Sequence, residues 1–449
     1  MQSVLIANRG EIARRIIRTC KKLGISTVAV HSEADAGALH ATEGDESICL
    51  GPSAPAESYL AVDRVLQAAI DSGVEAVHPG YGFLSESAGF ARRVLDAGLI
   101  WVGPSPDAIE LMGDKVNARN RMSEAGVPIA PGSFETLTDV NHAVQVAEDI
   151  GYPIMVKASA GGGGIGMTVA QTEAELTAAF DRASAQAARF FGTPGMLLER
   201  YLPHSRHIEV QILGLADGQV IPLGDRDCSV QRRHQKVAEE SPSPGLTNEF
   251  RTRMWRAAVD AALAVDYRGA GTVEFLVYGD GADADFAFLE MNTRLQVEHP
   301  ITELVTGLDL VEQQLLIASL QPVSFDPSAV SISGHALEFR IYAEDPVRFL
   351  PRPGTIAEWV EPVGEHIRVD GGYRSGDVVT PFYDPLLAKL CVWGRDRTEA
   401  LARGAEAVAD FRISGIQTNL PFFERLLTDD GFRSGRYDTR IVERMMRTS

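Results

Sequence analysis

A polar stretch from Glu290 to His299, with Glu274 upstream, has the residue types of a metal and anion site. Alternate side chains of an extended segment lie on the same face. On that spacing one face of the stretch is wholly polar: Glu290, Asn292, Arg294, Gln296 and Glu298. Carboxylate and amide oxygens suit a hard cation such as Mg²⁺, and a guanidinium suits a small planar anion. The stretch therefore predicts a cation beside an anion. The alternative is a half-solvated edge strand with salt bridges.

A glycine-rich run follows a strand-like segment that ends in Lys157. Five glycines occupy the six positions from 161 to 166. Glycine lets backbone N–H groups approach phosphate oxygens and leaves a loop free to close and reopen. The Gly-Lys-Ser/Thr signature of a P-loop is missing. The run predicts a mobile nucleotide-binding loop, with a flexible linker as the alternative.

Three further stretches of the chain carry polar side chains in recognisable patterns. Residues 197–203 are typical of a strand, from which Glu199 and the following backbone would reach an adenine edge or solvent. Residues 204–211 alternate, and 225–236 are rich in basic groups, which indicates an electropositive site or a solvated charged loop. Residues 335–345 alternate as well, so that Arg340 shares a face with Glu338 and Tyr342, where a salt bridge is its ordinary role.

Composition limits the class of protein. A chain of 449 residues is expected to fold as about two to four domains. The net charge of −19 argues against broad nucleic-acid or anionic-membrane binding. We find no signal-peptide pattern and no apolar run of transmembrane length, and the four cysteines are scattered, so we expect reduced thiols in the cytoplasm. Cys228 is interpreted as a bystander rather than a nucleophile.

The elements that must position these residues follow from hydrophobic periodicity. Strands at 4–7, 27–31, 75–78 and 100–102 alternate with helices at 12–22, 61–72 and 88–97, which predicts a parallel sheet. The loops 8–11 and 79–86 follow strands, where such sheets bind ligands. Further along, we expect these elements: helices at 108–125, 140–149 and 173–188, strands at 154–157, 208–213, 220–224, 271–278 and 286–291, and an α+β region from 335.

Taken together, the polar segments resemble those of the biotin carboxylase family, within the ATP-grasp superfamily. The matching runs span nearly the whole chain in order: 6–13, 78–86, 112–115, 157–167, 224–236, 290–300 and 340–346. The resemblance implies three regions of mixed α/β and α+β class. These are an N-terminal doubly wound parallel sheet (1–113), an ATP-grasp domain (114–330) with a mobile lid at about 131–202, and a C-terminal α+β domain (331–449).

The resemblance also implies roles for single residues. The nucleotide would be held by Lys115, Lys157, the lid residues Gly161, Gly162, Gly163, Gly164, Gly166 and Met167, the adenine contacts Glu199 and Leu202, and the pocket residues His207, Gln231, His234 and Lys236. Glu274, Glu290 and Asn292 resemble the ligands of Mg²⁺ or Mn²⁺. Lys236, Arg294, Gln296, Val297, Glu298 and Arg340 resemble the bicarbonate and biotin site. Within it Glu298 resembles the base for bicarbonate and Arg340 the group that stabilises a biotin enolate.

The implied activity is ATP-dependent carboxylation of biotin by bicarbonate, through carboxyphosphate. The implied partners are a biotin carrier protein, a carboxyltransferase subunit and a second copy of the chain. The lid usually carries Arg or Lys at the position of Ile165, so lid closure is in question there. Tyr342 is closer to acyl-CoA carboxylase α-subunits than to the stand-alone bacterial subunit. The chain ends at Ser449 without a biotin-attachment motif, so we expect the carrier on another polypeptide.

Two other functions compete with this one. An ATP-grasp ligase that joins a carboxylate to an amine would share Lys115, Lys157 and the metal ligands but would not need Arg294 to Glu298 with Arg340. A catalytically silent scaffolding subunit would bind ATP without bicarbonate-dependent turnover. The sequence leaves open whether an acyl-CoA, pyruvate or urea is the final carboxyl acceptor.

Overall fold

The N-terminal part of the chain forms a parallel sheet, as its alternating segments predict. In the computed structural model, which describes residues 1–159, 167–191, 194–279 and 281–447, this sheet has the strand order β3-β2-β1-β4-β5. Its strands are β1 (Ser3–Ile6), β2 (Ser26–Ser32), β3 (Glu46–Gly51), β4 (Ala76–His78) and β5 (Ile100–Trp101), and its helices are α1 (Gly10–Leu23), α2 (Leu39–Glu43), α3 (Val62–Asp71) and α4 (Ala88–Asp96).

Chain order along this sheet reverses at β1, whose neighbours are β2 and β4. The loops after β1 and β4 therefore meet at one edge, the place where open α/β sheets bind ligands. Asn8 Nδ2 joins the two loops by donating to the carbonyls of Pro79 and Tyr81, each at 2.7 Å.

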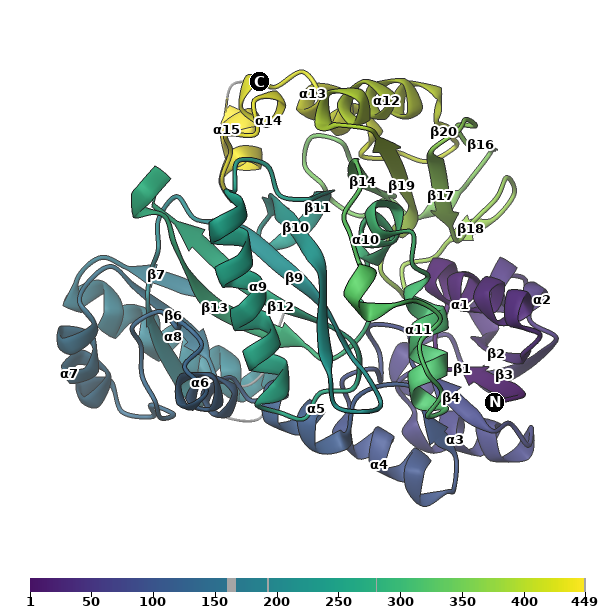
Figure 1. Ribbon diagram of the computed structural model, residues 1–449, viewed down its shortest axis with the longest axis horizontal. Helices are drawn as coiled ribbons and strands as arrows, with labels where there is room; N and C mark the ends of the chain where they lie inside the picture. Colours follow the sequence, from purple (N-terminus) through teal and green to yellow (C-terminus); the bar gives the residue numbers. More distant parts are fainter. Residues whose placement is uncertain (160–166, 192–193, 280, 448–449) are drawn as a thin grey trace.

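One larger antiparallel sheet runs through the centre and the C-terminal part of the molecule (Figure 1). Its order, among the described residues, is β13-β12-β9-β10-β11-β14-β19-β17. The bounds are β9 (Arg206–Gly214), β10 (Val220–Arg232), β11 (Gln235–Ser241), β12 (Gly269–Tyr278), β13 (Asp285–Asn292), β14 (His335–Tyr342), β17 (Ile367–Gly371) and β19 (Leu386–Gly394). Because β11 pairs with β14, the regions on either side of residue 330 share a sheet.

A separate three-stranded sheet, in the order β7-β6-β8, lies beside the central sheet with α7 and α8 against it (Figure 1). Its elements are β6 (Ile154–Ala158), β7 (Thr168–Ala170), β8 (Met196–Arg200), α7 (Val140–Ile150) and α8 (Glu173–Phe191). Apolar residues of all five pack into one cluster, including Val144, Val156, Ala170, Phe180 and Leu198. Burial of that cluster gives this small unit its own core.

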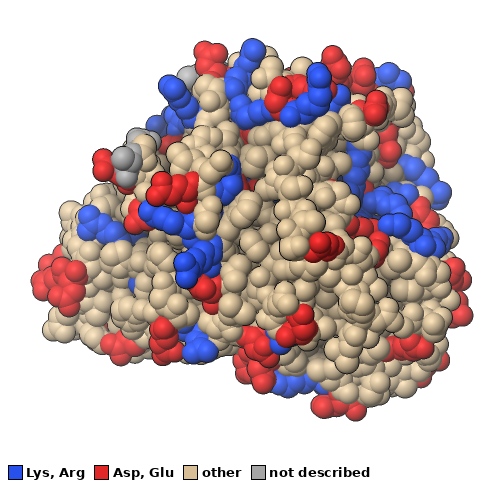
Figure 2. All heavy atoms as spheres, viewed as in Figure 1, with Lys and Arg blue, Asp and Glu red and all other residues tan. Residues whose placement is uncertain are grey.

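The remaining elements complete both flanks. They are α5 (Pro106–Gly113), α6 (Lys115–Glu124), α9 (Asn248–Leu263), α10 (His299–Thr306), α11 (Leu310–Ala318), β15 (Gly354–Thr355), β16 (Glu358–Val360), β18 (Val378–Val379), α12 (Arg397–Asp410), β20 (Arg412–Ser414), α13 (Leu420–Leu426), α14 (Asp430–Arg433) and α15 (Ile441–Arg447). Acidic and basic side chains are interspersed on the face seen in Figure 2, with a gathering of basic groups over α1. Within the described ranges no helix has the length and apolar character needed to cross a membrane.

Three local predictions differ from the structure. The helix expected over 108–125 is two helices, because Asp114 interrupts it and caps α6 by accepting from the N–H of Asn117 at 2.8 Å. The strand expected at 220–224 continues to Arg232, so residues 225–232 are a buried strand and not a solvated loop. The stretch from Glu290 to His299 is not one extended segment, since β13 ends at Asn292 and α10 begins at His299.

The buried carboxylate of Glu240 ties the central strands to the C-terminal helices. It accepts from His335 Nε2 and Arg397 Nε at 2.6 Å and from the Tyr437 hydroxyl at 2.5 Å. Burial alone raises the pKa of this carboxyl group, but the hydrogen bonds from His335 and Arg397 outweigh it and lower the pKa to about 2. The ionised form of Glu240 is therefore stabilised by folding.

We expect Glu240→Gln to lower the free energy of unfolding by about 3 kcal/mol at pH 7. The folded-state pKa is depressed, so the contribution is fully present above the ordinary value of 4.5 and is lost as pH falls toward 2. Urea unfolding of both proteins at several pH values measures it, with the exposed Glu110→Gln as control. A difference that stays constant from pH 7 to pH 3 would contradict the assignment.

Candidate functional site

A cavity of about 630 Å³ opens between the small sheet, the turn joining β10 to β11, and α15. Its walls combine apolar side chains such as Met155, Leu276 and Leu289 with charged ones. Seven of the residues predicted for nucleotide binding line it: Lys157, Met167, Glu199, Leu202, His207, Gln231 and His234. The predicted lid glycines, Gly161 to Gly164 and Gly166, and the departure at Ile165 lie outside the described residues. A mostly apolar cavity with a cationic end suits a nucleotide.

Cations converge at one end of this cavity. Lys157 Nζ donates to Glu199 in a short ion pair, and Arg119 Nη1 lies 3.3 Å from the other oxygen of Glu199. Lys115 Nζ donates to the carbonyl of Ala158 at 3.2 Å, and burial together with the charge of Lys157 lowers its pKa. Two ammonium groups held this close favour a ligand with several negative charges. The Glu199 carboxylate is paired with Lys157, so the backbone that follows Glu199 is the part available to bind an adenine edge.

The predicted metal ligands come together on two neighbouring strands. Glu274 on β12 and Glu290 on β13 are directly opposite in the pairing, where like charges destabilise a sheet. Asn292 donates its Nδ2 to Glu274 Oε1 at 2.9 Å. Two opposed carboxylates with an adjacent amide oxygen fit Mg²⁺ or Mn²⁺, which take hard oxygen ligands.

Lys236 lies where three buried carboxylates converge. Its Nζ lies 2.6 Å from Glu209, 2.8 Å from Glu274 and 2.7 Å from Glu298. In the part of the chain that the structure describes, two other trios bring ligand-type atoms within 4.8 Å: His207, Glu209 and Glu274, and Glu209, Cys228 and Glu298. Because the Lys236 ammonium group already lies among these carboxylates, we assign neither trio to a metal of its own, and Glu274 stays a candidate metal ligand only with Glu290 and Asn292.

Glu298 is fully buried between two cations. Oε1 accepts from Lys236, and Oε2 accepts from Arg340 Nη2 at 2.9 Å. Burial opposes ionisation, but Lys236 and Arg340 hold the pKa of Glu298 well below its ordinary value. Cys228 Sγ lies 3.8 Å from Oε1, and burial raises the pKa of this thiol well above its ordinary range. Glu298 is thus an ionised carboxylate, and Cys228 is a neutral thiol unsuited to nucleophilic attack.

Arg294 is paired with Glu86 and Asn292, while the negative charge of Glu298 still acts on it. Arg294 donates to Glu86 at 3.0 Å and to Asn292 Oδ1 at 2.8 Å, so its guanidinium points toward the loop after β4. The chain bends after Asn292, and Pro300 in the first turn of α10 suits a helix start. The alternating-face argument fails beyond the end of β13. Gln296 nevertheless returns to the site, donating to Glu274 Oε1 at 3.1 Å.

The alternation predicted at 204–211 is confirmed from Arg206 onward, since His207 and Glu209 on β9 pair with charged groups of the site while Ile208 and Val210 pack in an apolar cluster. Arg226, on the neighbouring strand, was missed as a site residue. Its guanidinium is fully buried and donates to Glu209 at 2.5 Å and to Gln211 at 2.6 Å. Glu239, which lies 2.6 Å from Arg340, was missed as well. Alternation on β11 could not have identified Glu239, because it lies three residues from Lys236 and the pairing of β10 with β11 shifts register between them.

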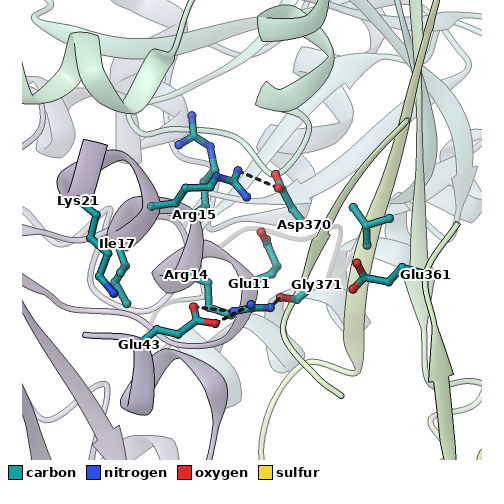
Figure 3. A pocket seen from close by; sticks show the side chains of 11 residues that line it. Glu11, Arg14, Arg15, Ile17, Lys21, Glu43, Glu361, Asp370 and Gly371 are labelled. Carbon is teal, nitrogen blue, oxygen red and sulfur yellow. Dashed lines mark hydrogen bonds and ion pairs between the residues drawn. The ribbon is translucent and has the colours of Figure 1, made fainter. Parts of the chain in front are cut away.

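A second cavity, of about 350 Å³, lies between α1 and the strand end at Asp370 and Gly371 (Figure 3). Arg14 crosses it to join Glu43 at 2.6 Å, and Glu11 lies on its wall. Arg18 Nη2 reaches Asp370 at 2.9 Å from the opposite side. The cavity carries mixed charge and lies at the junction of the N-terminal and C-terminal parts.

Comparison with known proteins points to one family. Three family models match consecutive parts of the chain: biotin carboxylase N-terminal domain over residues 1–109, the carbamoyl-phosphate synthase L chain ATP-binding domain over 114–324, and biotin carboxylase C-terminal domain over 338–444. A biotin carboxylase of Halalkalibacterium halodurans is 51% identical, with 98% of this chain and 97% of that protein covered.

Solved structures agree with the sequence relatives. A biotin carboxylase of Campylobacter jejuni in a β,γ-ATP complex matches with a TM-score of 0.96 and 43% identity, covering 99% of this chain and 98% of that one. The biotin carboxylase domain dimer of Hydrogenobacter thermophilus 2-oxoglutarate carboxylase, in complex with MgADP, ADP and bicarbonate, matches with a TM-score of 0.94 and 43% identity, covering 99% and 97%.

Proposed function

This chain belongs to the biotin carboxylase family, and we propose how its own residues perform the family's reaction. It is an ADP-forming ligase that uses ATP, a divalent cation and bicarbonate to carboxylate the biotin of a carrier protein. That reaction is the first half-reaction of a biotin-dependent carboxylase. The observation that carries the residue assignment is the buried Glu298 carboxylate, held between Lys236 and Arg340 beside the opposed pair Glu274 and Glu290.

In the first step a bicarbonate oxygen attacks the γ-phosphorus of ATP, the bond to the β-phosphate oxygen breaks, and ADP leaves. Bicarbonate is a weak nucleophile until its proton is removed, and Glu298 is the ionised carboxylate positioned to accept that proton. Arg294 and Gln296 orient the anion. Lys115 and Lys157 neutralise charge on the transferring phosphoryl group, which needs electrostatic stabilisation more than covalent help.

Glu274, Glu290 and Asn292 would hold the divalent cation. That cation supplies charge neutralisation for the nucleotide phosphates. Because Glu274 and Glu290 lie opposite each other, their mutual repulsion is relieved when the cation binds. His207 Nε2, 2.6 Å from Glu274 Oε2, fixes the orientation of that carboxylate.

In the second step carboxyphosphate breaks into CO₂ and phosphate. Phosphate takes the proton from the biotin ureido nitrogen, and the resulting enolate attacks CO₂. Arg340 offsets the negative charge on the ureido oxygen. None of these steps forms a covalent enzyme intermediate, which agrees with a neutral, buried Cys228.

We infer that the carboxylated biotin belongs to a separate carrier protein and passes to a carboxyltransferase. We also infer that the protein is a homodimer in the cytoplasm. We further infer that its domains divide at residues 113 and 330, with a lid subdomain at about 131–202. The dimeric 2-oxoglutarate carboxylase domain supports the dimer. The carboxyltransferase subunit determines which molecule finally receives the carboxyl group.

The test is ATP hydrolysis by the purified protein with Mg²⁺, with and without bicarbonate and free biotin. We expect hydrolysis to require bicarbonate, to rise when biotin is added, and to yield carboxybiotin. Stimulation by an amino acid or amine instead would indicate a different ATP-grasp ligase. Nucleotide binding without bicarbonate-dependent turnover would indicate a silent scaffolding subunit.

A further inference from the structure

The turn that presents Glu298 is held by a buried lysine outside the predicted site. Lys389 Nζ, on β19, donates to the backbone carbonyl of Val297 at 3.0 Å, and the Lys389 side chain is fully buried. The preceding carbonyl, of Gln296, accepts from His299 Nδ1 at 2.7 Å. Both carbonyl groups before Glu298 are therefore fixed by side chains, which restricts the backbone that carries the base.

Lys389 stands beside Arg340 in the sheet. The two residues are directly opposite in the pairing of β14 with β19, so their side chains leave the same face. Arg340 bonds the side chain of Glu298, and Lys389 bonds the peptide that joins Val297 to Glu298. Two adjacent cations thus hold the side chain and the backbone of the same catalytic segment.

The other contacts of Lys389 lead to the N-terminal sheet. Its Nζ lies 3.0 Å from Glu11 Oε2, and Glu11 Oε1 accepts a short hydrogen bond from the Tyr81 hydroxyl. Burial disfavours a charged lysine, but Glu11 and Asp370 outweigh it and raise the pKa of Lys389. Glu11 lies on the wall of the second cavity (Figure 3). Through Glu11, Lys389 therefore joins the first turn of α1 and the loop after β4 to the turn at Glu298.

We propose that Lys389 is a positioning residue for bicarbonate: by holding the Val297 carbonyl, it sets the orientation of the turn that binds this anion. The proposal rests on the proposed function. A charge-assisted hydrogen bond to a backbone carbonyl is strong and directional. Because burying an ammonium group without hydrogen-bond partners is costly, the partners of Lys389 are an important part of its role. Among the described residues, the polar partners of Lys389 are Glu11 and the Val297 carbonyl, and neither Glu11 nor Val297 lines the nucleotide cavity. Its loss should therefore affect bicarbonate and not ATP.

The test is Lys389→Met, which keeps the length and apolar stem of the side chain and removes the ammonium group. We expect the KM for bicarbonate to rise about 10-fold or more, and the KM for ATP to change less than about twofold. Lys22→Met is the matched control, because Lys22 is an exposed lysine in a surface pair with Glu312. It should leave both constants unchanged.

Lys389→Met also leaves Glu11 as a buried carboxylate without its cation, so stability needs its own control. In Glu11→Gln with Lys389→Met that charge is removed, and we expect thermal stability to recover while the KM for bicarbonate stays high. Recovery of the bicarbonate KM in the double variant, or equal losses for bicarbonate and ATP, would overturn the proposal. Absence of bicarbonate-dependent hydrolysis in the unmodified protein would overturn the proposed function instead.

Discussion

Glu298→Gln is expected to abolish bicarbonate-dependent ATP hydrolysis, lowering kcat by roughly 10²-fold to 10⁴-fold, while nucleotide affinity stays within about threefold. Glutamine has nearly the same shape but cannot accept a proton. The carboxylate it replaces is fully buried and contacts Lys236, Arg340 and Cys228. None of these three residues is among those that line the large cavity, and Lys236 keeps Glu209 and Glu274 as partners, so nucleotide affinity should change little.

Two measurements make this test specific. Binding of a non-hydrolysable ATP analogue, with and without Mg²⁺, reports on the nucleotide site, and phosphate release at saturating bicarbonate reports on the chemical step. Glu365→Gln, at a side chain that is 89% exposed, is the matched control and should behave as the unmodified protein. Near-normal turnover in Glu298→Gln would remove Glu298 as the base.

Periodicity predicted β1, β2, β4 and β5 of the N-terminal sheet because these strands are apolar, but it missed β3 (Glu46–Gly51), whose side chains are mostly exposed or half-buried. The same reasoning identified β9, where alternation places His207 and Glu209 on the polar face and Ile208 on the apolar one. The prediction that alternate side chains from Glu290 to His299 share one face failed, because this rule holds only within a strand and β13 ends at Asn292. Beyond Asn292 the bends that turn Arg294 toward Glu86 depend on a loop far away in the sequence.

The sequence reasoning also missed single charged side chains that are buried in the structure. Arg226 and Lys389 are charged residues whose burial is explained by partners on other elements, which are Glu209 on β9 for Arg226 and Glu11 in α1 for Lys389. The sequence around Lys389, Leu386-Leu387-Ala388-Lys389-Leu390-Cys391, does contain a signal, since a lone lysine in an apolar strand is costly unless it is paired. Its partners depend on how α1 and the turn at Val297 pack against β19, which periodicity does not specify.

Arg340→Gln is expected to uncouple the two steps of the reaction. Arg340 Nη2 is held between Glu239 at 2.6 Å and Glu298 at 2.9 Å, and its buried Nε has no hydrogen-bond partner among the described residues. A guanidinium fixed in this way has a donor left for the developing charge on the biotin ureido oxygen. Removing one such donor costs about 10²-fold to 10³-fold, so we expect carboxybiotin formation to fall by that factor.

Hydrolysis of ATP should fall much less than carboxybiotin formation, because Lys236 still neutralises Glu298 when Arg340 is lost. The number of ATP molecules hydrolysed per carboxybiotin formed is therefore the decisive measurement, and it should rise steeply in Arg340→Gln. Arg340→Lys keeps the charge but not the fork of donors, and should restore hydrolysis more fully than carboxylation. Arg352→Gln, at an exposed arginine paired with Asp345, is the control. Equal losses of hydrolysis and carboxylation would place Arg340 in the first step, as a support for Glu298, and would remove it from biotin activation.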